Sequence, residues 1–444
     1  MRNSFIAYLR RWGDLGLAAR LYLWHVATLT FSLASVGLLF NLAVLALGYS
    51  RSDLGRINLV AVWASVVASL PLWWLATKIG LRIGLIVHAV LQAAAVMLYA
   101  IAPTLPALLV AASLAGASSV LFQVSAPPLM MQHSNAATRD HLFSASEALT
   151  IGVSGIGSLF AGVLPTLCAM LLGVAPESGA AYQATFGLAA VGVALSLVPL
   201  LLGGAWATHV ELQTASSVTQ TDTRQHTEVE PLVKGYKRLL LLRQPLPLVA
   251  LLIAPLLISI GAALSLPYLN LFFKQRFGVS DTVLGLIFAL LNISTGLAVL
   301  LGPVLSARLG KIRTIVATQL ISIPFLLLMS FAPLLAVTVG AALVRAAMFN
   351  IGRPLYDAFA MERTAAPLRP IVIGIMGGVS TVGFLVAPEI STRVQIQYGF
   401  APLFLATAIC YALATLAIAV LFLRPASRAA HGWYNSSASE GEGV

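Results

Sequence analysis

The segment Gly278–Gly310, GVSDTVLGLIFALLNISTGLAVLLGPVLSARLG, decides the fold because the chain contains a related copy of it. The earlier copy is Gly48–Gly80, GYSRSDLGRINLVAVWASVVASLPLWWLATKIG, 230 positions upstream. Aligned without a gap, nine of the 33 positions are identical, among them paired glycines and a paired serine. Apolar composition alone does not place glycines and serines at matching positions. The match therefore predicts a duplicated chain of two halves of about 200 residues each.

The composition is that of a membrane protein. Of the 444 residues, 59% are hydrophobic and only 9% are charged, and the mean hydropathy is +0.93. This leaves too little polar surface to cover a soluble fold, so lipid must be the main solvent. Apolar runs of about 20 residues exceed the roughly 10 residues of a barrel strand and favour helices. We expect an all-α membrane protein.

Apolar windows predict twelve transmembrane helices in two groups of six. They lie near 21–47, 55–76, 82–102, 105–131, 145–172 and 180–204, and near 246–273, 282–306, 312–332, 335–361, 369–391 and 398–424. The predicted organisation is an amphipathic lead-in (1–20), a first six-helix bundle (21–204), a polar linker (205–245), a second bundle (246–424) and a polar tail (425–444).

Basic residues are distributed unevenly between the two sides of this arrangement. The side with both termini has 19 of the 26 lysines and arginines, the opposite loops have five, and Arg345 and Arg353 lie inside a span. Cytoplasmic loops carry an excess of Lys and Arg. We therefore expect both termini in the cytoplasm of a bacterium and the spans in its inner membrane. The net charge of +11 reflects topology rather than a nucleic-acid partner, because the basic residues form no single patch.

Two short basic loops carry a resemblance to a known family. They are GPVLSARLGKIR over 302–313 and, more weakly, WWLATKIGLR over 73–82. Both resemble the loop signature G-x-L-a-D-R-x-G-R-K of the major facilitator superfamily, which also has twelve spans arranged as six plus six. The resemblance covers about 15–425, and its matching loop positions are Arg308, Gly310 and Lys311 in one copy and Lys78, Gly80 and Arg82 in the other.

The resemblance implies a transporter whose two bundles rock around a central cavity that opens to either side in turn. We expect a drug-exporter-like branch of the family. The resemblance also implies a gating role for Lys78, Arg308 and Gly310. Ala307 and Thr77 stand where the signature has its aspartate, so the charge relay of that aspartate is not expected here.

Span ten, VTVGAALVRAAMFNIGRPLYDAFAME over 337–362, is the most polar predicted helix. Charges at mid-bilayer are costly and normally face a cavity or a partner. At 100° per residue, Asn350, Arg353 and Asp357 share one face, and the last two can pair as i and i+4 neighbours. One interpretation is that Asp357 takes up a proton and releases Arg353 to bind substrate; the other is a permanent structural ion pair.

Three further polar positions follow the repeat or lack a partner. Gln123 in FQVSAP corresponds to Asn350 in FNIGRP, so it is the matching candidate in the first half. Arg345 has no acid within two helical turns, and it either meets an anionic group of the substrate or extends toward the outer surface. Asn41 and Asn270 occupy equivalent places near the outer ends of spans one and seven and form either an outer gate or simple helix contacts. His25 and His88 either titrate or only form hydrogen bonds.

The sequence contains no nucleotide-binding loop, no zinc-ligand spacing and no G-x-S-x-G, so we predict no enzyme activity, catalytic residue, metal or cofactor. The expected partners are a small-molecule substrate, protons and membrane lipids, with a monomer as the expected state. The predicted function is proton-coupled export of small amphipathic compounds. Alternatives are uptake or exchange of an anionic metabolite, lipid flipping, and a non-transporting sensor with the same fold.

Overall fold

A computed structural model describes residues 15–134, 139–202, 246–364 and 369–423. All regular elements in these ranges are helices, and they provide twelve spans long and apolar enough to cross a membrane. The all-α fold class and the number of spans are therefore confirmed. The predicted linker and tail, and most of the predicted lead-in, lie outside the described residues.

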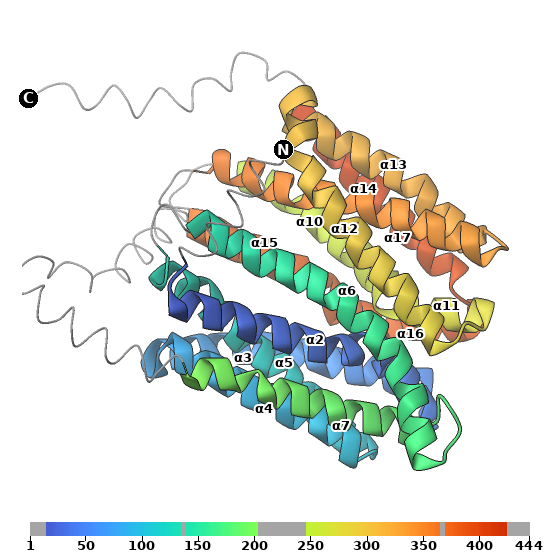
Figure 1. The fold of residues 1–444 in the computed structure, drawn as a ribbon. Helices are drawn as coiled ribbons and strands as arrows, with labels where there is room; N and C mark the ends of the chain where they lie inside the picture. Colours follow the sequence, from blue (N-terminus) through green and yellow to red (C-terminus); the bar gives the residue numbers. More distant parts are fainter. Residues whose placement is uncertain (1–14, 135–138, 203–245, 365–368, 424–444) are drawn as a thin grey trace, which may run out of the picture.

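Six helices form the first bundle, drawn from blue to green in Figure 1. They are α2 (Leu17–Ala46), α3 (Arg51–Ile79), α4 (Leu81–Ile101), α5 (Leu105–Gln132), α6 (Arg139–Leu172) and α7 (Gly179–Leu195). The first helix begins at Leu17, four residues before the predicted position, and Arg20 Nε donates a hydrogen bond to the carbonyl of Leu15 at this start.

The second bundle repeats the arrangement with two interrupted spans. It consists of α10 (Leu246–Ser265), η1 (Leu266–Tyr268) and α11 (Leu269–Phe277), α12 (Asp281–Leu309), α13 (Lys311–Phe331), α14 (Leu335–Glu362), α15 (Arg369–Val382), η3 (Gly383–Leu385) and α16 (Ala387–Tyr398), and α17 (Ala401–Ile418) with η4 (Ala419–Leu423). Proline cannot donate a backbone hydrogen bond, and Pro267 lies in the first interruption.

The repeated segments have the same backbone geometry at their ends. The four glycines that bound the repeated segments have φ between 61° and 90°: Gly48, Gly80, Gly278 and Gly310. Only glycine adopts this region without steric cost. Ser50 and Ser280 each begin the following helix, with a side-chain oxygen that accepts a hydrogen bond from the backbone N–H three residues later. Much of the repeat therefore consists of residues that end one helix and start the next.

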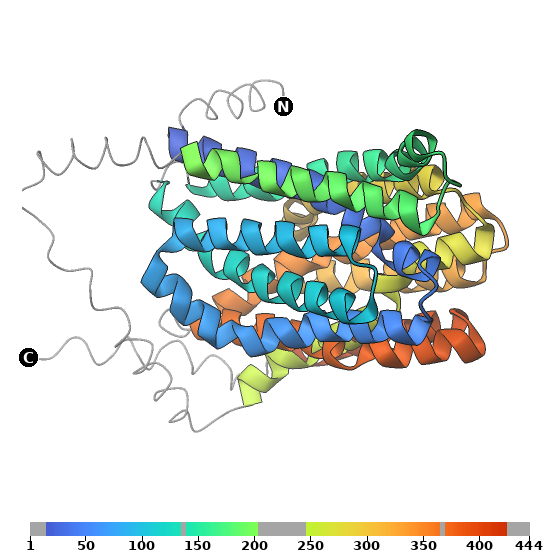
Figure 2. The same ribbon diagram turned by 90° about the horizontal axis from the view of Figure 1, so that it is seen from below.

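Among the residues that the structure describes, the two bundles share an apolar core at one end only. We call the end with the loops 47–50, 173–178, 278–280 and 399–400 the far end, and the end with the Gly80 and Gly310 turns the near end. Figures 1 and 2 show the far-end loops together on the right, where α11 and α16 approach the first bundle.

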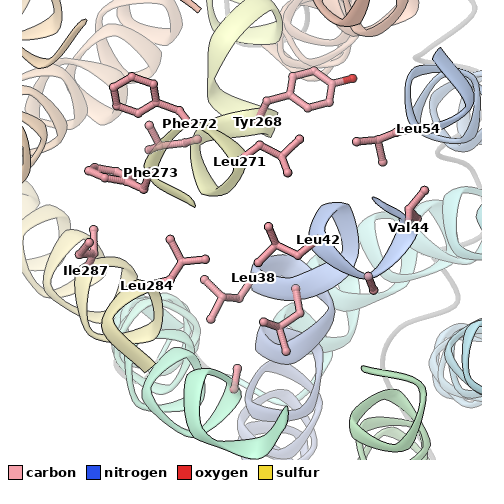
Figure 3. Packing of buried hydrophobic residues seen from close by; sticks show 14 of the residues in the cluster. Leu38, Leu42, Val44, Leu54, Tyr268, Leu271, Phe272, Phe273, Leu284 and Ile287 are labelled. Carbon is pink, nitrogen blue, oxygen red and sulfur yellow. The ribbon is translucent and has the colours of Figure 1, made fainter. Parts of the chain in front are cut away.

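At the far end, one cluster joins Leu38 and Leu42 of α2 with Leu271 and Phe272 of α11 and Leu284 of α12 (Figure 3). Two further clusters of buried residues each belong to a single bundle, and both lie toward the near end. Lipid is as apolar as leucine, so these contacts stabilise the structure by close packing rather than by removal from water. The bundles are thus packed together at the far end and have separate cores at the near end.

Candidate functional site

The two predicted gate asparagines meet at the far end. Asn41 Nδ2 donates to Asn270 Oδ1 at 2.9 Å and to the carbonyl of Pro267 at 2.6 Å. Asn270 Nδ2 in turn donates to the carbonyl of Leu38 at 2.7 Å. Both side chains are buried, with 6% and 2% of their surface exposed. Equivalent positions of the two halves therefore bind to each other across the boundary between the bundles.

A partly buried ionic cluster lies beside them and was not predicted from the sequence. Lys274 Nζ lies 2.5 Å from Glu177 Oε1 of the first bundle and 2.6 Å from Asp281 Oδ1 of its own bundle. Tyr182, also of the first bundle, donates its hydroxyl to Asp281 Oδ2 at 2.8 Å, and the Asp281 backbone N–H donates to Glu177. Asp281 is only 2% exposed. We call these four residues the far-end latch.

The latch has a counterpart related by the repeat. Arg51 occupies the position in the first copy that Asp281 occupies in the second. Its guanidinium donates to the carbonyl of Gln395 at 3.0 Å and to Gln275 Oε1 at 2.8 Å, both in the second bundle. At both equivalent positions, the first residue of the helix reaches across to the opposite bundle. A charged residue at this position of each copy was the sequence signal for the latch.

Glycines permit the closest approach of the bundles. A Cβ on Gly285 of α12 would lie 2.5 Å from the Ser158 carbonyl oxygen of α6, and one on Gly162 would lie 2.5 Å from the Asp281 carbonyl oxygen. At the equivalent crossing of α3 and α16, a Cβ on Gly55 would meet the side chain of Thr392. The paired glycines of the repeat, Gly55 and Gly285, are therefore both contact points between the bundles.

The polar face predicted for span ten is exposed. Arg353 and Asp357 are both exposed, and Asn350 is half-buried with its amide bonded to the carbonyl of Ala346 in its own helix. Among the described residues, the structure contains no direct ion pair between Arg353 and Asp357. The predicted i, i+4 contact is thus not made in this conformation.

The neighbours of α14 establish where this face points. Gly352 lies against α13, and Tyr356 donates its hydroxyl to the Leu251 carbonyl of α10. Because successive residues differ by 100°, Arg353 and Asp357 lie on the side away from α13. In Figure 1, α13 lies at the margin farthest from the first bundle. The polar face of α14 therefore turns toward the boundary between the bundles.

Arg345 lies elsewhere. It is 6% exposed and points to α17, where Nη2 donates to Tyr411 Oη at 3.5 Å and the guanidinium lies over Phe349, 5.6 Å from the ring centroid. Its Nε is buried and has no hydrogen-bond partner among the described residues. The side chain does not extend to the surface, and the structure does not bring it together with Arg353 and Asp357.

The remaining predicted residues are exposed at the near end or in the near half. Gln123 of α5 is exposed, as are Lys78 and Arg308 at the ends of α3 and α12. Lys78 lies over the ring of Trp74 at 6.0 Å, and Gly310 has the positive φ that ends α12. Hydrogen bonds and ion pairs between described residues of different bundles all lie toward the far end.

His25 and His88 lie inside helices of the first bundle and are almost completely buried. Each Nδ1 is 2.8 Å from a backbone carbonyl, of Ser196 and Ser118 respectively. A carbonyl only accepts, so each Nδ1 carries the hydrogen. The structure thus favours hydrogen bonding over titration for both residues, because no described acid pairs with either ring.

Replacing Asn270 by alanine is expected to loosen the far end. It removes two of the three hydrogen bonds that the asparagine pair makes between the bundles and leaves the one from Asn41 to the Pro267 carbonyl. Interhelical hydrogen bonds in membranes contribute about 0.6 kcal/mol each. The sum of about 1 kcal/mol corresponds to a shift of about fivefold toward the far-end-open state. A cysteine at Leu42, with Cys168 and Cys410 replaced by alanine, should react faster with a membrane-impermeant maleimide added at the far side.

Asn58→Ala is the control, because the Asn58 amide lies 3.5 Å from the Tyr268 hydroxyl, at the limit of a hydrogen bond. Equal reactivity of Leu42→Cys in the Asn270→Ala and Asn58→Ala proteins would contradict the gate role of the asparagine pair.

The comparisons with known proteins agree with this architecture. Residues 251–435 match the family model described as Major Facilitator Superfamily. A search of curated protein sequences gave no match. The fold is similar to a crystal structure of a mutant of the nucleoside transporter NupG, with a TM-score of 0.68 and 15% identity over 92% of this chain and 100% of that chain.

It is similar to the same degree to a D-xylose-proton symporter, with a TM-score of 0.68 and 14% identity over 90% of this chain and 96% of that chain. The matched family and these similar proteins are transporters rather than enzymes, as the sequence analysis predicted. Identities this low establish the fold alone. The whole chain therefore has the fold of these transporter structures, and its second half, residues 251–435, matches the model of the Major Facilitator Superfamily.

Proposed function

We propose that the protein is a secondary active transporter that works by alternating access and exports small amphipathic compounds in exchange for protons. The segments 21–204 and 246–424 are the two moving units, and one chain surrounded by lipid is sufficient for the cycle. With both termini in the cytoplasm of a bacterium, the far end faces outward across the inner membrane.

The observation that carries this proposal is the difference between the two ends. The bundles share an apolar core, the asparagine pair and the latch at the far end, whereas the near-end cores are separate. Alternating access requires an assembly of this kind, in which one set of contacts breaks as another forms. In this orientation, the described conformation is closed to the outside and takes up substrate from the cytoplasm.

Arg353 and Asp357 are the proposed coupling residues. They lie on the face of α14 turned toward the other bundle, and Asp357 is five residues from the near end of the helix, or roughly 8 Å along its axis. The absence of a direct ion pair between these two described residues supports a switchable interaction over a permanent one. Protonation of Asp357 would weaken its attraction for Arg353 and change the charge presented to the substrate.

Proton coupling is also supported by the similarity to the D-xylose-proton symporter. That protein moves its substrate and proton in the same direction, whereas the proposal here is exchange. The two modes differ in a simple experiment, because an inward-directed proton gradient drives a symported compound inward and an exchanged compound outward.

Asp357→Asn is expected to abolish transport driven by a pH gradient while leaving exchange of substrate without a gradient. Asparagine preserves the size and polarity of the side chain, but its amide group neither binds nor releases a proton near neutral pH. The measurement uses proteoliposomes loaded with ethidium as a probe of small amphipathic compounds. Gradient-driven efflux should fall by at least about tenfold, a loss that corresponds to about 1.4 kcal/mol of coupling.

Glu389→Gln is the matched control, since Glu389 pairs with Arg393 in α16 at 2.5 Å and is proposed to have no coupling role. Unchanged gradient-driven efflux in the Asp357→Asn protein would disprove the coupling role. Accumulation of a nucleoside or sugar with the proton gradient, and no ethidium movement, would replace export by uptake.

A further inference from the structure

We infer that Arg345 marks an anion-binding site inside the second bundle, between α14 and α17, that takes the carboxylate group of a small organic anion. The inference does not depend on the proposed export, because binding can be measured without transport. It rests on the charge balance of the second bundle, on the geometry of the guanidinium and on a comparison with the first bundle.

The second bundle contains no acid that could neutralise Arg345. Residues 246–423 include four acids in all: Asp281, Asp357, Glu362 and Glu389. Three of them form ion pairs with Lys274, Lys311 and Arg393 respectively. Asp357 is exposed on another face of α14 and lies twelve residues from Arg345, or about 18 Å along the helix. Among the described residues, Arg345 therefore has no carboxylate partner.

The charge cannot be removed by deprotonation. Arginine stays protonated in proteins, so this position carries a full positive charge inside the membrane. A buried charge without a partner is strongly destabilising. The contact with the face of Phe349 and the long hydrogen bond to Tyr411 offset only part of this cost. An anion from outside the chain would supply the missing charge.

The orientation of the guanidinium defines the kind of anion. Nε and Nη2 form one edge of the group, from which two N–H bonds point in parallel. Nε has no partner among the described residues, and Nη2 has only the Tyr411 hydroxyl at 3.5 Å. A carboxylate binds this edge with both oxygens. The Tyr411 hydroxyl, now an acceptor, could rotate and donate to the same anion as a third contact.

The first bundle shows the arrangement without a charge. Ser118 of α5 corresponds to Arg345 at the offset that relates Gln123 to Asn350. Its hydroxyl donates to Gln92 Oε1 at 2.6 Å, so the neutral site is satisfied within the bundle. Only the second bundle has an arginine at this position. Of the two corresponding residues, only Arg345 has a buried donor, Nε, without a hydrogen-bond partner among the described residues. The difference indicates a ligand rather than a general requirement of the fold.

The experiment measures thermal unfolding of the purified full-length protein in detergent. Sodium formate, sodium benzoate and sodium chloride are titrated separately at constant ionic strength, which is maintained with sodium HEPES. The melting temperature of the native protein is expected to rise with carboxylate concentration and then saturate, because a ligand that binds only the folded state stabilises it by mass action. A rise in melting temperature with formate and benzoate that exceeds the rise with chloride identifies an organic carboxylate. A rise of the same size with chloride would assign the site to a resident inorganic anion instead.

Three variants locate the binding. Arg345→Gln should abolish the rise, and Arg345→Lys, which keeps the charge but not the two-pronged edge, should weaken the apparent affinity by at least about tenfold. Arg313→Gln, which removes an exposed arginine from the neighbouring helix α13, should bind as the native protein does. If Arg345→Gln does not fold, Tyr411→Phe serves in its place and should lower the affinity. The inference is overturned if the native protein shows no saturable rise with any anion, or if Arg345→Lys and Tyr411→Phe both bind carboxylate with unchanged affinity.

Discussion

Leucine at Gly285 is expected to prevent closure of the far end and to reduce transport by at least about a hundredfold. A Cβ at this position would lie 2.5 Å from the carbonyl oxygen of Ser158 and 2.9 Å from Cα of Gly162. Both are backbone atoms of the facing helix α6, so no rotamer change can relieve the overlap. The helices α6 and α12 would have to separate, and the shared apolar core and the latch would separate with them.

The size of the effect follows from the energy of overpacking. Forcing a larger side chain into a well-packed contact costs about 1–3 kcal/mol, and more where backbone atoms must move. A cost of about 3 kcal/mol, borne only by the far-end-closed state, lowers the population of that state by about a hundredfold relative to the open one. The variant should fold, because the contact lies between the bundles and not within either of them.

Gly152→Leu provides the matched control on α6, because a Cβ there would meet nothing within 4 Å. Both variants are compared in proteoliposomes by ethidium exchange, and by the reactivity of a cysteine at Leu42 from the far side. Normal exchange with Gly285→Leu would show that the far end does not need to close as tightly as described.

Helix ends were the part of this fold that the sequence could predict best. The glycines with positive φ and the serines that cap α3 and α12 act within a few residues of their own position. Their physical role does not depend on the rest of the chain, so a comparison of two segments is enough to find them. The face shared by Asn350, Arg353 and Asp357 was predictable for the same reason, because helical periodicity is local.

Contacts between the bundles were only partly predictable. The equivalence of Asn41 and Asn270 follows from the repeat, but their hydrogen bond depends on how the two halves are positioned. The i, i+4 spacing of Arg353 and Asp357 permits an ion pair, yet spacing does not determine whether the side chains point to each other or away. The structure leaves both exposed without a direct contact.

The latch was missed because its parts come from separate segments. Glu177 follows α6, Tyr182 lies in α7, and Lys274 and Asp281 lie on either side of the loop between α11 and α12. Each charged residue of the set stands near the end of a span, where contact with water is the usual expectation. The burial of Asp281 and the contacts of Lys274 and Glu177 result from the approach of two bundles, which no single stretch of sequence encodes.

Lys274→Met is expected to open the far end more strongly than Asp281→Asn. The latch contains two carboxylates and a single ammonium group, because Lys274 contacts both Glu177 and Asp281. Removal of the lysine leaves two negative charges close together, one of them on a residue that is 2% exposed. Breaking a buried ion pair in this way costs about 3 kcal/mol at the lower end of the usual range, which suits the partial exposure of Glu177.

Asp281→Asn has a milder effect because the remaining pair of Lys274 and Glu177 is neutral, and the asparagine can still accept the hydrogen bond from Tyr182. For the same reason, the double variant Lys274→Met/Asp281→Asn should close better than Lys274→Met alone. Acid should also reduce the effect of Lys274→Met, since a proton bound by either carboxylate removes the repulsion. Ranking these variants by how far each opens the far end therefore tests the charge balance of the latch, and not only whether the latch contributes to closure.

The measurement is the distance between spin labels at the far ends of the two bundles, at Leu172 and Leu334, which are 54% and 64% exposed. Lys274→Met should lengthen the distance distribution at neutral pH, with a smaller change for Asp281→Asn. Lys311→Met is the matched control, because Lys311 pairs with Glu362 within the second bundle at the near end. A latch that closes equally well in the Lys274→Met protein and in this control would mean that apolar packing alone holds the far end together, and that the ionic cluster only accompanies the closure.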